Sequence, residues 1–143
     1  MRHALVLATL ALSGCATTYQ LSVMPRDSGK MYTGTATEHA NGQAALSIAI
    51  EGRTYTGTWV TTVPERTHGF VVGGFGFGRR GMGLGTVVSI DNPAGGEAKA
   101  LLSASDGSGL RCDFRSGRGT GGGVCKDDRG KEYDVQLRQA PRG

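Results

Sequence analysis

Residues 41–61 read NGQAALSIAIEGRTYTGTWVT, and this stretch decides the fold class. It opens with Asn41-Gly42, a pair typical of tight β-hairpin turns. Every second residue from Leu46 to Ile50 is a large apolar one, and Glu51-Gly52 supplies the next turn. From Arg53 to Thr61 the two large aromatic residues share one face, and threonines occupy the other. Alternation with a period of two predicts two antiparallel strands, each with one buried face.

The same alternation recurs on both sides of this stretch. It is found at Gln20–Met24, Met31–His39, Glu97–Ser105, Leu110–Arg115 and Tyr133–Arg138. After the N-terminal segment no stretch repeats apolar residues with the three-and-four spacing of a helix. The sequence therefore predicts an all-β fold, a small antiparallel meander of seven to nine short strands. A closed barrel and a two-sheet sandwich both fit this pattern, and the barrel is favoured because closure removes exposed strand edges.

Composition points to one small domain without a nucleic-acid function. The chain has 143 residues, of which 25 are glycine, and residues 20–140 are enough for a single β-domain with a lean core. Its formal net charge is +4, but charges of both signs are interleaved along the chain. Nucleic acid is excluded as a partner because no basic cluster or aromatic-basic stacking strip is present. No cofactor is expected.

The first 14 residues have the layout of a signal peptide. Arg2 and His3 give a short positive start, and Ala4 to Leu12 is apolar except for Thr9. A nine-residue helix would span only ~14 Å, well short of the ~30 Å hydrocarbon core of a bilayer. We therefore expect residues 1–14 to be a cleaved, helical targeting segment and not a membrane span.

Leu12-Ser13-Gly14-Cys15 resembles the lipobox of bacterial lipoproteins. The resemblance implies that the thiol of Cys15 receives a diacylglycerol, that cleavage exposes its amino group, and that residues 15–19 form a short lipidated tether. Two or more acyl chains anchor a protein stably. Ala16 stands where an aspartate commonly retains such proteins in the inner membrane, so the resemblance implies the outer membrane, facing the periplasm. The strand containing Tyr133–Gln136 is also similar to those of small envelope lipoproteins of unassigned activity.

Two cysteines, Cys112 and Cys125, remain after Cys15 is assigned to lipid. Outside the reducing cytosol they are expected to form a disulfide, placed across a hairpin whose connection is Arg115–Gly122. Two free buried thiols and half of a metal site are the alternatives. A metal is disfavoured because neither His39 nor His68 lies at a ligand spacing from the cysteines.

The glycine-rich segment 69–85, GFVVGGFGFGRRGMGLG, allows three interpretations. Residues 76–81 match the dinucleotide pattern GxGxxG, but no helix signal or βαβ unit surrounds them, so this interpretation is rejected. A pair of glycine-laden strands at a barrel corner is favoured. The alternative is a loop that contacts the membrane or a partner through its apolar and basic residues. These residues are Phe75, Phe77, Arg79, Arg80, Met82 and Leu84.

No catalytic motif is found, and the carboxylates near glycine at Asp106-Gly107 and Asp127–Gly130 are expected to form turns and not calcium sites. The favoured function is a non-catalytic binding or structural module held near the membrane, with an envelope protein or glycan as partner. One alternative is a periplasmic inhibitor of a lytic enzyme, since lipid-anchored lysozyme inhibitors are similar disulfide-bearing barrels, although their motifs are not reproduced here. Another is a cell-wall or lipid hydrolase that uses Asp127, Asp128 or Asp134.

Overall fold

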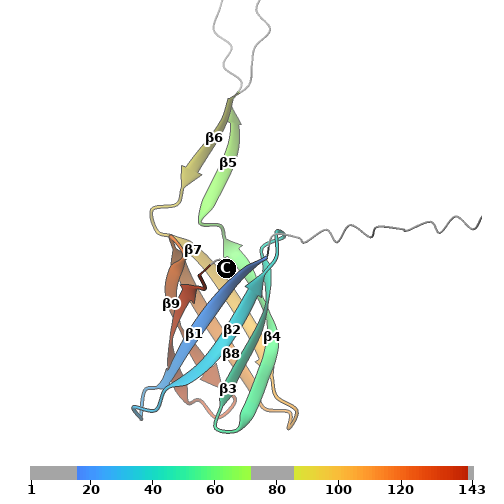
Figure 1. The fold of residues 1–143 in the computed structure, drawn as a ribbon, viewed down its shortest axis with the longest axis vertical. Coiled ribbons are helices and arrows are strands. Elements are labelled where there is room, and N and C mark those ends of the chain that lie inside the picture. The colour runs from blue at the N-terminus through green and yellow to red at the C-terminus, as the bar shows by residue number, and fades with distance from the viewer. Residues whose placement is uncertain (1–15, 72–85, 142–143) are drawn as a thin grey trace, which may run out of the picture.

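The computed structural model describes residues 16–71 and 86–141 and shows an eight-stranded closed antiparallel barrel with a two-stranded ribbon at one end (Figure 1). The strands are β1 Thr17–Pro25, β2 Tyr32–Glu38, β3 Gln43–Ile50, β4 Arg53–Val63, β5 Arg66–Val71, β6 Thr86–Asp91, β7 Gly96–Ser103, β8 Gly109–Gly117, β9 Thr120–Asp127 and β10 Glu132–Gln139. The all-β prediction is confirmed, and of its two architectures the structure has the barrel. Its eight strands lie within the expected seven to nine, and the ribbon adds two more.

The barrel is a meander with one insertion. Its strands follow the order β1-β10-β9-β8-β7-β4-β3-β2. The β5–β6 ribbon separates β4 from β7 in the sequence but is not part of the barrel wall, so β4 pairs directly with β7. Closure comes from the pairing of β1 with β10, which places Leu21 opposite Leu137. A closed sheet leaves no unpaired edge in the barrel wall.

The predicted alternation directs one side chain in two to the interior. Tyr55 and Trp59 are 3% and 6% exposed, and the threonines between them face outward. Eight strands enclose a space just wide enough for side chains to fill. The buried hydrophobic residues are Leu21, Val23, Ala36, Ala44, Leu46, Ile48, Ile50, Tyr55, Trp59, Ala100, Leu102, Ala104, Leu110, Cys112, Phe114, Cys125, Tyr133, Val135 and Leu137.

Several inward positions are glycines because the neighbouring strand comes too close for a side chain, and the approach is closest at Gly57 and Gly123. A Cβ at Gly57 would lie 2.0 Å from the carbonyl oxygen of Leu101, and one at Gly123 would lie 2.1 Å from that of Asp113. Such glycines let strands bend sharply where a small barrel closes.

The hairpin turns follow their sequences, with one difference. Both residues of Glu51-Gly52 and of Arg118-Gly119 have positive φ angles, as a two-residue type I′ turn requires. The hairpin predicted at Asn41-Gly42 is present, but four residues separate its strands. There the side-chain oxygen of Asn41 accepts a hydrogen bond from the backbone of Gln43 at 3.1 Å.

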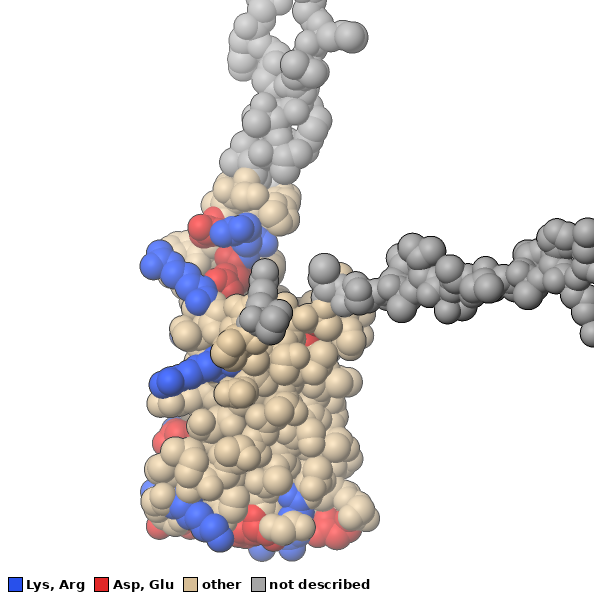
Figure 2. Space-filling view, viewed as in Figure 1, with Lys and Arg blue, Asp and Glu red and all other residues tan. Residues whose placement is uncertain are grey.

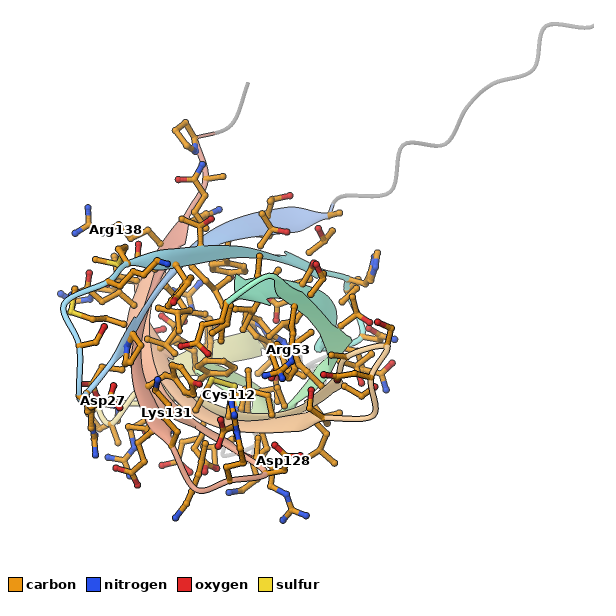
Figure 3. All side chains as sticks on the ribbon, turned by 90° about the horizontal axis from the view of Figure 1, so that it is seen from below. Asp27, Arg53, Cys112, Asp128, Lys131 and Arg138 are labelled. Carbon is orange, nitrogen blue, oxygen red and sulfur yellow. A yellow bond between two sulfur atoms is a disulfide. The ribbon has the colours of Figure 1, made fainter. Side chains whose placement is uncertain are left out.

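Charged side chains gather at the lower end of the barrel, which is at the bottom in Figures 1 and 2. Lys131 lies 3.3 Å from Glu51 and 3.6 Å from Asp27, and Arg53 lies 2.7 Å from Asp106. In the view along the barrel axis from this end, Arg53 lies inside the ring that the strands form (Figure 3). On the face shown in Figure 2, most charged side chains gather at this end and at the base of the ribbon. The outward positions of β1 to β4 between the two ends are uncharged.

The opposite, upper end is where β1 begins and where the β5–β6 ribbon leaves the barrel (Figure 1). Residues 17–19, which were predicted to belong to a tether, are instead part of the barrel, because β1 starts at Thr17 and Tyr19 already pairs with Ala36 and Gln139. None of the described residues forms a helix long and apolar enough to cross a bilayer.

Candidate ligand-binding site

The two cysteines of the β-domain form the predicted disulfide. Cys112 and Cys125 lie directly opposite each other on β8 and β9, with their Cα atoms 4.0 Å apart, and both point into the barrel. The connection between the strands is shorter than the predicted Arg115–Gly122. Both strands continue to a two-residue turn because glycines allow close pairing there.

The other predicted site residues are not among those that the structure describes. Cys15 belongs to residues 1–15, and Phe75, Phe77, Arg79, Arg80, Met82 and Leu84 belong to residues 72–85. The strands that lead into and out of this second segment are β5 and β6, which pair from Arg66 opposite Asp91 to Val71 opposite Thr86.

The three carboxylates considered for a hydrolase lie in different surroundings at the lower end. Asp127 is buried and accepts hydrogen bonds from the backbone of Arg129 and Lys131, both at 2.9 Å. Asp128 is exposed in the same turn, and Asp134 pairs with Arg26 on the outside of β10. Asp127 is thus a turn-forming residue, as predicted.

Asp106 plays the same part in the β7–β8 turn. Its carboxylate accepts a hydrogen bond from the backbone of Ser108 at 3.0 Å, and it pairs with Arg53. Hydrogen bonds from Ser108 and the charge of Arg53 hold the pKa of Asp106 below its ordinary value. Within the described residues no cluster of three metal-binding side chains is found.

The interior of the barrel contains a hollow of about 90 Å³ at its upper end. A cavity of about 150 Å³ holds the six carbon atoms of benzene, so the hollow has room for about three to four non-hydrogen atoms. It is lined by Tyr19, Glu38, Trp59, Thr61, Glu65, Gly96, Glu97, Ala98, Phe114, Ser116, Thr120 and Leu137. We call this space the upper hollow.

Three aromatic rings form one wall of the upper hollow. The ring centroids of Tyr19 and Trp59 are 5.5 Å apart, and those of Trp59 and Phe114 are 5.9 Å apart, both pairs tilted by more than 50°. Trp59 is more than nine-tenths buried, and its indole nitrogen has no hydrogen-bond partner among the described atoms. An unpaired buried donor costs about 1–3 kcal/mol, so folding gains nothing from the polar edge of this ring.

Carboxylates line the same hollow as the aromatic rings. The hydroxyl of Tyr19 donates a hydrogen bond to Glu38 at 3.0 Å, and Glu65 accepts one from the backbone of Arg118. Within residues 16–71 and 86–141 neither glutamate has a cationic side chain within 4 Å, whereas Glu97 pairs with Arg115 at 3.2 Å. The upper hollow therefore carries an excess of negative charge.

The raised pKa of Tyr19 is consistent with the excess of negative charge in the upper hollow. Burial raises the pKa of Tyr19 to about 12, and the charge of Glu38, its hydrogen bond and the charge of Glu65 act in the same direction. Both carboxylates therefore lie close enough to influence one phenol. At neutral pH Tyr19 stays protonated and serves as a donor.

A register shift in β4 and a glycine in β7 determine where Glu65 lies. The register of β4 against β7 shifts between Thr61 and Val63, and Glu65 follows where the chain turns into the ribbon. A Cβ at Gly96 would lie 3.1 Å from the backbone nitrogen of Glu65, so the glycine leaves room for this crossing.

Sequence reasoning placed Trp59 and Phe114 on inward faces but did not identify the hollow. Tyr19 was assigned to the tether, and no role was predicted for Glu38 or Glu65. A signal was present at Glu38, which continues the inward phase of Gly34 and Ala36 on β2.

No protein-family model and no curated protein matches the chain. Two solved structures of β-barrels resemble it in fold, each with a TM-score of 0.48. One is a de novo designed fluorescence-activating β-barrel with 15% sequence identity, covering 86% of this chain and 91% of its own. The other is a redesigned β-barrel with 9% identity, covering 87% and 90%.

Proposed function

We propose that the chain is a lipid-anchored protein of the bacterial cell envelope whose barrel is a non-catalytic binding module. In this proposal the upper hollow holds a small ligand, or a small group that projects from a larger partner. The lower end of the barrel has a structural role.

The observation that carries the binding function is the upper hollow with its unpartnered tryptophan. A protein interior is normally close-packed, and its buried polar atoms are normally paired. Both rules are broken here at one place, since space remains beside Trp59 and its nitrogen lacks an acceptor. Sites that depart from packing rules in this way are where function is expected.

Anchoring is supported by the lipobox of residues 12–15 and by the position of the first strand. Only Ala16 lies between Cys15 and β1, and two Cα–Cα steps span at most about 8 Å. A lipid on Cys15 would therefore hold the upper end of the barrel, and with it the upper hollow, next to the bilayer.

The binding function is tested by filling the hollow. Ala98 lines it, and Ala98→Leu would occupy part of its space, whereas Ala45→Leu adds the same atoms to the outer surface of β3. Trp59 is the only tryptophan in the chain, so its fluorescence reports on this site. We expect a panel of small amines, carboxylates and polyols to contain a compound that shifts this emission saturably in the wild type and Ala45→Leu, and at least 10-fold more weakly in Ala98→Leu.

Absence of any saturable shift in the wild type, checked by calorimetry with the same panel, would overturn the binding function. So would equal binding by Ala98→Leu, because the ligand would then sit elsewhere.

Anchoring is tested by Cys15→Ser. We expect the wild type to incorporate radiolabelled fatty acid and to remain in membranes after a carbonate wash, and the variant to do neither. A double variant, Cys112→Ala with Cys125→Ala, keeps the lipobox and should still be labelled. A Cys15→Ser protein that stays in the washed membranes would contradict the anchoring proposal.

A further inference from the structure

We propose that the upper hollow recognises an organic ammonium group, a cation on a short carbon skeleton. This inference rests on the proposed binding function and adds the chemical class of the ligand. Its basis is the combination of an aromatic wall with two carboxylates that have no cationic side chain within 4 Å among the described residues.

The aromatic wall suits a cation better than a neutral ligand. The faces of tryptophan, tyrosine and phenylalanine rings carry partial negative charge and attract ammonium groups that come within about 6 Å of their centres. Tyr19, Trp59 and Phe114 are tilted relative to one another, so the wall is formed by rings at different angles. Aromatic surfaces of this kind bind quaternary ammonium ligands.

The carboxylates of Glu38 and Glu65 give the hollow a negative charge, which attracts a cation and repels an anion. Glu38 and Glu65 come from different parts of the barrel, the end of β2 and the crossing after β4, and both act on the hydroxyl of Tyr19. Both glutamates are partly buried, and charges of one sign held close together repel each other unless a counter-charge joins them. A cation in the hollow would be that counter-charge.

Size limits the ligand to a small head group. Room for about three to four non-hydrogen atoms accommodates a trimethylammonium group, which has four, but not an extended chain. Such an ammonium group could reach the site as a free molecule or as the head group of a lipid. The shared chemistry is the cation, and the two sources differ in whether a membrane surface must be present.

The test uses a matched pair of ligands. Choline and 3,3-dimethyl-1-butanol have the same shape, but only choline is charged. We expect choline to change the fluorescence of Trp59 saturably and to bind the full-length Cys15→Ser protein at least 10-fold more tightly than the neutral compound does.

A matched pair of variants tests the carboxylates. Glu38→Gln combined with Glu65→Gln keeps an oxygen that can accept from Tyr19 but removes both charges, and should weaken choline binding about 10-fold. Glu51→Gln makes the same change at the lower end of the barrel and should leave binding unaltered. Circular dichroism and urea unfolding of the double variant establish that it is folded.

The outcomes separate the two proposals. If the neutral compound binds as tightly as choline, or if the double variant binds choline like the wild type, the ammonium inference is overturned and the binding function stands. If neither choline nor its neutral analogue binds, and no compound of the wider panel binds either, the ammonium inference and the binding function are both overturned. Phosphatidylcholine and phosphatidylglycerol vesicles then identify the source, because binding to the former alone, competed by free choline, assigns a lipid head group.

Discussion

Asp127 shows what a buried carboxylate does at the scale of one residue. Burial acts to raise its pKa, but the backbone N–H groups of Lys131 and Arg129, the charge of Arg129 and the hydroxyl of Tyr133 together outweigh it, and its pKa is lowered. The Tyr133 hydroxyl lies 3.3 Å from the carboxylate, and its own pKa is raised to about 12, first by burial and then by the charge of Asp127. Asp127 is therefore held ionised as an acceptor that fixes the β9–β10 turn.

Replacing Asp127 by alanine should lower the free energy of unfolding by about 2–3 kcal/mol, because two backbone donors and a buried hydroxyl lose their acceptor. Urea unfolding followed by circular dichroism measures the loss. Asp128→Ala changes the exposed neighbour in the same turn and should leave the unfolding midpoint unchanged. Equal midpoints for the two variants would show that the contacts of Asp127 do not stabilise the fold.

The stabilisation by Asp127 should also depend on pH. A carboxyl whose pKa is lower in the folded state than the ordinary 3.8 stabilises the fold above that value, and its contribution is lost as the pH falls through the folded pKa. The difference in unfolding free energy between wild type and Asp127→Asn should be constant from pH 7 to 5 and shrink below about pH 4. A difference that grows on acidification would contradict this sign.

At the scale of strands, the sequence predicts which residues point into the barrel wherever this follows from the alternation of neighbouring residues along the chain. The inward residues of β3, β4, β8 and β10 were identified correctly because one buried face imposes a period of two. The same logic fails for β9, whose inward positions include Gly121 and Gly123 and so show no apolar alternation. It also cannot identify β5 and β6, which pair with each other outside the barrel.

The upper hollow could not be predicted because barrel closure creates it. Tyr19, Trp59 and Phe114 lie on β1, β4 and β8, and no local pattern states that these strands face one another across an interior. Glu38 and Glu65 sit where strands end, and polar residues at such positions are normally read as turns. The disulfide was predictable from the number of cysteines and the expected compartment, neither of which refers to the fold.

The glycines of the bent strands should be intolerant of even a methyl group. Gly57→Ala would place a Cβ 2.0 Å from the carbonyl oxygen of Leu101, where backbone has to move, and should lower the free energy of unfolding by about 2–4 kcal/mol. Gly117→Ala is the control, because nothing lies within 4 Å of its added carbon. Thermal unfolding of both variants measures the effect, and equal stability would show that the close approach at Gly57 relaxes freely.

The disulfide should stabilise the β8–β9 hairpin by restricting the unfolded chain. Cys112 and Cys125 are 13 residues apart, and closing a loop of this length contributes about 3 kcal/mol. We expect the double alanine variant to unfold at lower urea concentration than the oxidised wild type, by about that free energy. Adding reductant should lower the midpoint of the wild type only, whereas a reductant effect on the variant would point to another cause.

At the scale of the whole molecule, the ribbon and the barrel are two separate sheets, because no strand of the ribbon is hydrogen-bonded to a described strand of the barrel. The eight barrel strands close on themselves, and β5 pairs only with β6 among the described strands. The two meet at the upper end, where the backbone of Asn92 donates to the carbonyl of Glu65 at 2.8 Å. This contact brings the two ends of the insertion as close together as the ends of a hairpin turn.

Deleting residues 66–91 and joining Glu65 to Asn92 through Asn-Gly should therefore leave the barrel intact. The new two-residue turn suits the antiparallel ends it connects, and the upper hollow keeps Glu65. We expect a circular dichroism spectrum typical of β-sheet, one cooperative unfolding transition within about 1 kcal/mol of the full chain, and choline binding like that of the Cys15→Ser protein. Loss of cooperative unfolding would show that the ribbon is part of the folding unit, whereas loss of binding in a folded barrel would place part of the ligand site on the ribbon.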